Sequence, residues 1–158
     1  MRRTNLGRAP CPIARSLDEI GDWWTLLIVR DAFHGAHRFG EFQRGLGLAK
    51  NVLSARLRKM VADGILEMRP AADGGAHNEY HLTEKGLGLR VILVALRQWG
   101  EDNLFDCGEP TTVMVDNAKG EPIGRLRLTA RDGRAISPLD VEIKQGWASH
   151  RNEAQPPQ

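Results

Sequence analysis

Four side chains that can hydrogen-bond to DNA lie on one side of a predicted helix over residues 49–63: Lys50, Asn51, Ser54 and Arg58. Asparagine can bond to the edge of adenine and arginine to that of guanine, whereas lysine and serine suit phosphate oxygens. A helix with this face has the groups needed to read a major groove. Basic helix faces are also common on proteins that bind no nucleic acid.

The opposite side of the same helix is apolar. Leu53, Leu57, Met60 and Val61 fall at positions i, i+4, i+7 and i+8, a spacing that predicts one buried stripe. Arg56 lies on the flank between the two sides, where it could reach the phosphate backbone. The pattern therefore predicts a helix that is held from behind and is polar in front.

The segments around this helix strengthen the DNA interpretation. A short helix from Phe39 and a glycine-containing turn precede it, and an Asp-Gly stop follows at residues 63–64. Two strand-like runs, 65–70 and 78–82, then enclose a glycine-rich tip. This order is that of a winged helix-turn-helix, a mainly α fold with a small β hairpin as the wing.

Three further side chains are expected to support DNA binding from outside the helix. Arg38 stands just before the short helix, where it could meet a phosphate, and the link at residues 36–39 is long enough to pair with the wing as a single strand. Arg69 and His77 stand on either side of the wing tip. Asp73 and Glu79 argue against a strongly basic wing, so we expect the wing to contribute less than the helix.

Two helices are predicted ahead of this motif. Pro12 suits the first position of a helix whose apolar residues are Ile13, Leu17 and Ile20. Asp22 is a plausible N-cap for the next helix, which ends at His34-Gly35. That second helix is apolar on nearly every side, as central helices are. Its expected core residues are Trp24, Leu27 and Ile28.

Cys11 would occupy the N-cap of the first helix. Unpaired N–H groups there, with Arg8 and Arg15 nearby, would stabilise a thiolate and make the thiol reactive. The alternative is a small buried residue without chemistry, which is how most free cysteines behave. Cys11 is therefore a candidate redox sensor, and sequence alone slightly favours the inert alternative.

A longer helix is predicted over residues 83–104, with two adjoining apolar faces. One face can pack on its own domain and the other on a second copy. A twofold dimer would place two reading helices about 34 Å apart, one turn of DNA.

The character of the chain changes at Cys107. Three runs at 111–116, 124–129 and 139–144 alternate apolar and polar residues, which predicts a small antiparallel β extension. The expected domains are a flexible basic arm (1–10), the winged helix-turn-helix domain with its dimerisation helix (11–106), the β extension (107–147) and a disordered tail (148–158).

The motifs resemble those of the HxlR-type family of bacterial winged-helix transcriptional regulators, within the MarR-like superfamily. The resemblance spans roughly residues 11 to 100, and its motifs occur in one order at residues 11–13, 21–28, 38–42, 52–57, 63–66 and 79–86. It implies a homodimer on an inverted-repeat operator. In some members the cysteine before the first helix senses electrophiles or oxidants, a role that would fall to Cys11. Ala49 departs from the family, which often has Ser or Thr at this cap, and weakens the cap by about 1 kcal/mol.

Composition agrees with a DNA-binding protein. The net charge of +2 hides an asymmetry, because residues 1–60 carry eleven Lys and Arg against five Asp and Glu, whereas residues 61–158 carry eleven against fifteen. The basic half contains the proposed reading helix. No apolar run approaches the length of about eighteen residues that a membrane span needs. Two cysteines cannot form a disulfide framework, so we expect a bacterial cytoplasmic, nucleoid-associated protein.

The sequence has no phosphate loop, dinucleotide fingerprint, nucleophile elbow or set of metal ligands, so we expect no enzyme, cofactor or metal. The predicted function is a sequence-specific transcriptional regulator, with double-stranded DNA and a second copy as partners and a small molecule or oxidant as a possible effector. The alternatives are a winged-helix module that binds protein instead of DNA and a small enzyme that depends on Cys11.

Overall fold

The computed structural model describes residues 6–71, 73–75, 77–109 and 112–144. The chain divides into two units, residues 1–109 and residues 110–158, and each is treated by itself. The expected boundaries of arm, extension and tail stay predictions, since residues 1–5 and 145–158 lie outside the described residues. Within the described ranges, no helix combines the length and apolar character that crossing a bilayer requires.

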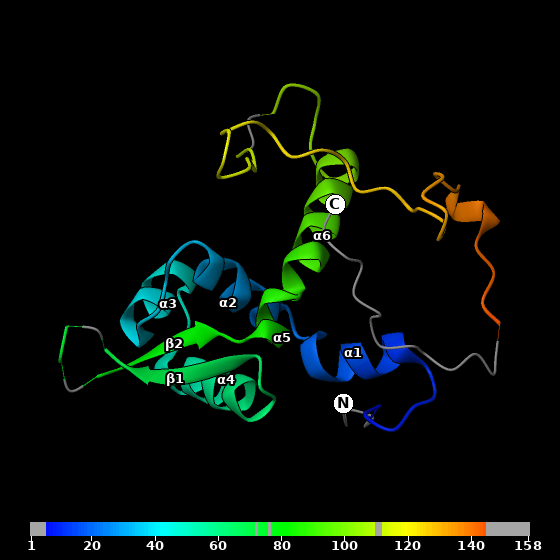
Figure 1. Ribbon diagram of the computed structural model, residues 1–158. Coiled ribbons are helices and arrows are strands. Elements are labelled where there is room, and N and C mark those ends of the chain that lie inside the picture. Colours follow the sequence, from blue (N-terminus) through cyan, green and yellow to red (C-terminus); the bar gives the residue numbers. More distant parts are fainter. Residues whose placement is uncertain (1–5, 72, 76, 110–111, 145–158) are drawn as a thin grey trace. The chain divides into compact units, whose positions relative to one another are not determined.

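The first unit consists of helices and one β hairpin (Figure 1). Its elements in chain order are α1 (Pro12–Ile20), α2 (Trp23–Phe33), α3 (Phe39–Leu46), α4 (Lys50–Ala62), β1 (Leu66–Pro70), β2 (Asn78–Leu82), α5 (Glu84–Leu87) and α6 (Leu89–Asn103). This order of two helices, a helix-turn-helix, a hairpin and closing helices is that of a winged helix-turn-helix. The predicted fold class is therefore confirmed for this unit.

Local side-chain chemistry sets the helix ends. The carboxylate of Asp22 accepts a hydrogen bond from the Trp24 backbone N–H at 2.9 Å and caps α2, as predicted. Ala49 is the N-cap of α4 and offers it no side-chain bond. Between α3 and α4 the chain turns at Gly47, whose φ of 64° lies in the left-handed region that glycine adopts without strain.

The hydrophobic core lies where α2, α3, α4 and β1 meet. Phe42, Leu53 and Leu57 are completely buried, and Met60 is 1% exposed. The predicted buried stripe of α4 is thus confirmed, with Val61 partly buried against the core. On α2, Ile28 is completely buried and Trp24 packs against the core.

The first two helices leave several apolar side chains uncovered. Ile13 and Leu17 are 66% and 54% exposed, so the α1 stripe does not pack on this unit except at Ile20. On α2, Trp23 is 72% exposed, and Leu27 is only half-buried, so the prediction of Leu27 as a core residue was wrong. An amphipathic pattern predicts that the apolar face of a helix is buried, but it does not show whether the same chain or another chain buries it.

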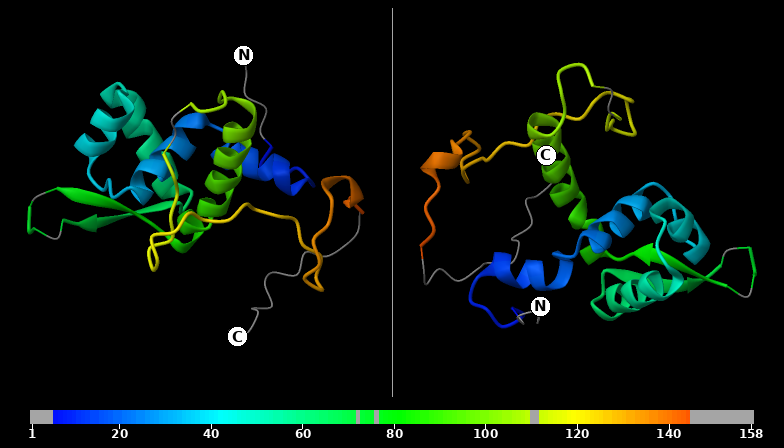
Figure 2. Two further views of the ribbon diagram at one scale, coloured as in Figure 1. Left: turned by 90° about the horizontal axis from the view of Figure 1, so that it is seen from above. Right: turned by 180° about the vertical axis from the view of Figure 1, so that it is seen from behind.

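The hairpin projects from the helices and is seen from two further sides in Figure 2. Its antiparallel register pairs Leu66 with Leu82 at the buried end and Pro70 with Asn78 at the outer end. The link before α3 joins this hairpin, because the Tyr80 N–H donates to the His37 carbonyl at 2.7 Å. The predicted pairing of the link with the wing is confirmed as this single backbone bond.

The helix predicted over residues 83–104 is divided in two at Gly88, between α5 and α6. The Thr83 hydroxyl caps α5 by accepting from the Gly86 N–H at 3.1 Å. Gly86 lies against the backbone of Ile65, just before β1, and a Cβ added there would come within 2.3 Å of the Ile65 carbonyl oxygen. This close approach fixes α5 on the base of the wing.

The second unit differs from the predicted small sheet. Its described part has two isolated β-bridges, Val115 to Pro122 and Thr129 to Ala135, and a short 3-10 turn at Pro138–Asp140. The turns expected at residues 117–120 and 131–134 are present, but the runs beside them do not form ladders with one another. Their apolar side chains are largely exposed, so within the described part of this unit no packing stabilises paired strands.

Candidate nucleic-acid interface

The outward face of α4 carries the predicted reading residues. Lys50, Asn51 and Arg58 are exposed, and Ser54 is half-buried. The Arg58 Nε–H donates to the Ser54 carbonyl at 3.3 Å, which lays the arginine along the helix surface. Because Leu53, Leu57 and Met60 fix the opposite side, these polar groups stay available to solvent or to a ligand.

Ala55 lies in the middle of this face and is exposed. It was not predicted as part of this face, because alanine has no hydrogen-bonding group. A small residue here allows close approach to a groove floor, and its methyl group can contact the methyl of thymine. The helical spacing of Asn51, Ala55 and Arg58 was the signal that could have found it.

Arg56 is occupied within the protein. Its Nη2 lies 2.5 Å from the Asp22 Oδ2, and the two side chains are 27% and 18% exposed. Asp22 also caps α2 through its other oxygen. The pair therefore ties α4 to the start of α2, and Arg56 does not point freely toward a backbone phosphate.

Arg38 is also paired, with two carboxylates of the wing. Its Nη2 lies 2.5 Å from Asp73 Oδ2 and 3.1 Å from Glu79 Oε1. The hydrogen bond that Arg38 donates to Asp73, and then those that it donates to Glu79, raise the pKa of Arg38, and the bond from Arg38 lowers the pKa of Asp73. The arginine thus joins the start of α3 to the hairpin.

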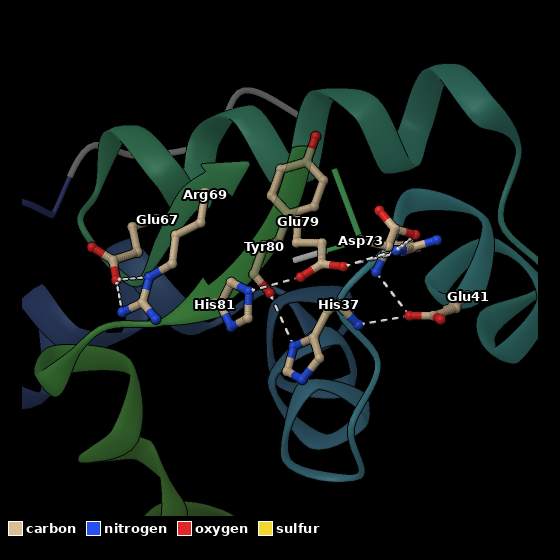
Figure 3. A network of polar contacts seen from close by, with 9 residues as sticks. His37, Glu41, Glu67, Arg69, Asp73, Glu79, Tyr80 and His81 are labelled. Atoms are coloured by element: carbon tan, nitrogen blue, oxygen red, sulfur yellow. Dashed lines mark hydrogen bonds and ion pairs between the residues drawn. The ribbon is translucent and has the colours of Figure 1, made fainter. Parts of the chain in front are cut away.

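Glu41 fixes the backbone on which Arg38 stands. Its Oε2 accepts hydrogen bonds from the backbone N–H groups of His37 at 2.7 Å and Arg38 at 2.8 Å. These bonds, with that from His37 the stronger influence, lower the pKa of the Glu41 carboxyl. Glu41 thereby fixes the backbone of the link whose His37 bonds to the wing (Figure 3).

The remaining predicted wing residues differ in their surroundings. Arg69 is exposed and forms an ion pair with Glu67 of the same strand. His77 is exposed beside the tip. A groove of about 710 Å³ lies between α3 and the wing. Its polar and aromatic lining includes Arg38, Arg44, His77, Asn78 and Tyr80.

Arg44 was not predicted as a site residue. It is exposed on α3, and its side chain lines the same groove as Arg38 and His77. Its position becomes evident only when the wing is folded back beside α3. The structure therefore brings Arg38, Arg44 and His77 together along one groove, which Glu41 also lines.

Cys11 is the N-cap of α1, as predicted, and its thiol is exposed and unbonded to another cysteine. The alternative that Cys11 is buried is therefore wrong, and its reactivity stays a prediction. Arg15 is engaged by the preceding segment, because its Nε–H donates to the Ala9 carbonyl at 2.5 Å. Cys107 is exposed as well.

A broad set of apolar side chains remains uncovered on α1 and α6. On α6, Val91, Leu96 and Trp99 are 60%, 49% and 59% exposed. Ile13 and Leu17 of α1 add to this set. Exposed apolar area on this scale is typical of a protein interaction surface.

Helices, turn, wing and basic outward helix define a winged helix-turn-helix protein of the transcription-factor class. The family of HxlR-like helix-turn-helix proteins matches residues 19–106. The chain belongs to this family.

Relatives and solved structures agree with this assignment. The HTH-type transcriptional regulator Rv3095 of Mycobacterium tuberculosis is 42% identical over 134 residues, which cover 85% of either chain. The crystal structure of PA1607, a candidate transcription factor, is similar with a TM-score of 0.85 and 49% identity over 90% of this chain and all of that one. The redox regulator HypR in its oxidised form is 33% identical, covers 61% of this chain and 100% of its own, and has a TM-score of 0.54.

Proposed function

We propose that this transcriptional regulator is a homodimer that binds an inverted-repeat operator through α4. Asn51 and Arg58 would contact base edges, and Lys50 and Ser54 would contact bases or phosphates. Arg38, Arg69 and His77 would contact the DNA backbone from the wing side. Arg56 is better assigned to holding α4, because Asp22 occupies it.

The observation that carries this proposal is the division of α4 into two faces. One face is pinned by side chains that are at most 1% exposed, and the other presents exposed Lys50, Asn51 and Arg58. A rigid helix with hydrogen-bonding groups on its free side is what major-groove reading requires. A helix of a protein-binding module would not need this set of base-reading groups.

The uncovered apolar side chains of α1 and α6 support a second copy as the partner. A dimer that covered Val91, Leu96 and Trp99 would remove them from water and would relate two α4 helices by a twofold axis. Sedimentation of the purified protein would give the mass of a dimer. Leu96→Asp would shift it to a monomer and weaken binding to a two-half-site duplex more than binding to a half-site.

The test of DNA binding is selection from a random-sequence duplex library with the purified protein. We expect enriched duplexes to contain an inverted repeat and their affinity to fall steeply with salt, since several phosphates would be contacted. A protein-binding module would enrich no sequence and would show no such slope for duplex DNA.

We also propose that oxidants or electrophiles regulate the protein through Cys11. The exposed thiol at the start of α1 adjoins the helix whose apolar residues we assign to the dimer, so a modification there would reach the arrangement of the two reading helices. HypR, a relative in sequence and fold, is described as a redox regulator.

The matched pair Cys11→Ser and Cys107→Ser tests this regulation, because both thiols are exposed. Diamide should change the affinity of the wild type and of Cys107→Ser for the selected duplex, and leave Cys11→Ser unaffected. The same response in Cys11→Ser would exclude Cys11 as the sensor. If the protein were instead a small enzyme that depends on Cys11, the wild type would turn over a substrate and Cys11→Ser would not.

A further inference from the structure

Arg38 is held by two carboxylates that differ in their setting. Its Nε and Nη2 groups donate to the same oxygen of Glu79, at 3.2 and 3.1 Å, and Nη2 also donates to Asp73 at 2.5 Å. Figure 3 shows the Glu79 carboxylate between His81 and the Asp73 region of the hairpin. One guanidinium therefore bridges the body of the wing and its tip.

Glu79 is the fixed partner of the two. It lies within β2, its side chain is only 13% exposed, and its second oxygen lies 3.3 Å from the His81 Nε2. Asp73 lies in the turn between the strands, and its side chain is 56% exposed. Its second oxygen accepts from the Gly75 N–H at 3.0 Å, so the carboxylate is oriented by its own turn.

An aspartate carboxylate and a backbone phosphate offer an arginine the same chemistry, which is an anionic oxygen that accepts from the guanidinium. An ion pair as exposed as that of Arg38 and Asp73 is weak, because water and salt screen it. A DNA strand that passes the wing can therefore replace Asp73 at little cost, while Glu79 keeps Arg38 in place.

We propose that Asp73 is an internal competitor for DNA, which occupies Arg38 in the free protein and yields it to a backbone phosphate on binding. The proposal rests on the proposed DNA-binding function, and it makes the Arg38–Asp73 ion pair a regulator of the affinity for DNA. Asp73 lowers the affinity for any duplex without changing the preferred sequence, because phosphate contacts carry no base information.

The exchange also predicts a salt effect. A phosphate that gains an arginine releases a condensed cation, but an Asp73 carboxylate set free from Arg38 attracts a cation in return. Arg38 therefore contributes less to the salt dependence than an unpaired arginine would. Removing the Asp73 charge should raise the magnitude of the slope of log affinity against log salt, by at most about 0.9.

A double-mutant cycle separates this competition from simple repulsion between Asp73 and DNA. The probe is a labelled duplex selected by the wild-type protein from the random library. Asp73→Asn should bind it about two- to fivefold more tightly than the wild type at 0.1 M salt. In an Arg38→Ala background the same substitution should leave the affinity unchanged.

Asp132→Asn is the matched control, because Asp132 is an exposed aspartate that pairs with Arg134 and accepts a backbone N–H two residues ahead, as Asp73 does. It should bind like the wild type. Unfolding midpoints of all variants identify any loss of fold.

Three results would overturn the proposal. An equal gain with and without Arg38 would mean general repulsion, and an unchanged or weaker affinity of Asp73→Asn would mean that the pair does not compete with DNA. A wild-type protein that retained no duplex would instead overturn the proposed function, and with it this inference. The first two results leave DNA binding itself intact, so failure of the competition proposal can be told from failure of the proposed function.

Discussion

The ion pair between Arg56 and Asp22 gives the sharpest structural prediction, because the two residues belong to different helices and have different second roles. The pair is partly sheltered, at 27% and 18% exposure, so we expect it to stabilise the fold by about 0.5 to 1 kcal/mol. Asp22 also caps α2, which is worth about 1 kcal/mol more. Arg56→Ala should thus cost about 0.5 to 1 kcal/mol, and Asp22→Ala, which also removes the cap, about 1.5 to 2 kcal/mol.

The double variant tests the reasoning. If the pair is broken by either change, Arg56→Ala should cost almost nothing in the Asp22→Ala background. Urea unfolding followed by circular dichroism, at one protein concentration because dimerisation shifts apparent stability, measures each free energy. Fully additive losses would refute the tether.

A DNA measurement on the same variant separates the tether from a phosphate contact. Arg56→Ala should leave the slope of log affinity against log salt as in the wild type. A slope reduced in magnitude by about 0.9 would instead show that Arg56 binds a phosphate.

Three further predictions concern residues that stabilise the helices and the link around the proposed interface. Gly86→Ala should destabilise the protein by about 1 to 3 kcal/mol in urea unfolding, since its Cβ would meet the Ile65 carbonyl oxygen at 2.3 Å; wild-type stability would contradict the close packing. Ala49→Ser should add about 1 kcal/mol in the same assay by capping α4, and a loss of stability would contradict the cap assignment. The wild type should have a larger free energy of unfolding than Glu41→Gln, and this difference should be constant above about pH 5. It should shrink as the pH falls below about 4.3, because the folded state lowers the pKa of the Glu41 carboxyl. A difference that grew on acidification would refute the prediction.

The α4 helix and the wing could be predicted from the sequence because their signals are local. Apolar residues at i, i+4, i+7 and i+8 lie on one side of a helix, so the spacing predicts that this side, with Leu53 and Leu57, faces the core. A glycine-rich tip between two alternating runs predicts a hairpin. The predicted strand limits differ from the observed ones by a single residue at one end. The reading face follows directly from the buried face.

The partners of the basic residues could not be predicted in this way. Arg56 and Asp22 are 34 positions apart, and Arg38 and Asp73 are 35 apart, so only the folded chain shows that these cations are already paired. The same holds for Arg44, which joins the groove only because the hairpin folds back beside α3.

The second unit shows a different limit. Alternation of apolar and polar residues predicts strands only where something covers the apolar side. Leu139 and Ile143 are 94% and 88% exposed, so the pattern exists without the packing that would turn it into a sheet.

The most direct test of the account is the affinity of Asn51→Ala/Arg58→Ala for the duplex that the wild-type protein selects. Both side chains are exposed on α4, so the double variant should keep the wild-type unfolding midpoint. We expect its affinity to fall by more than about tenfold, with Asn51→Ala alone relaxing the preference at one base pair and Arg58→Ala alone costing about 1 to 3 kcal/mol. An affinity equal to that of the wild type would contradict the assignment of α4 as the reading helix.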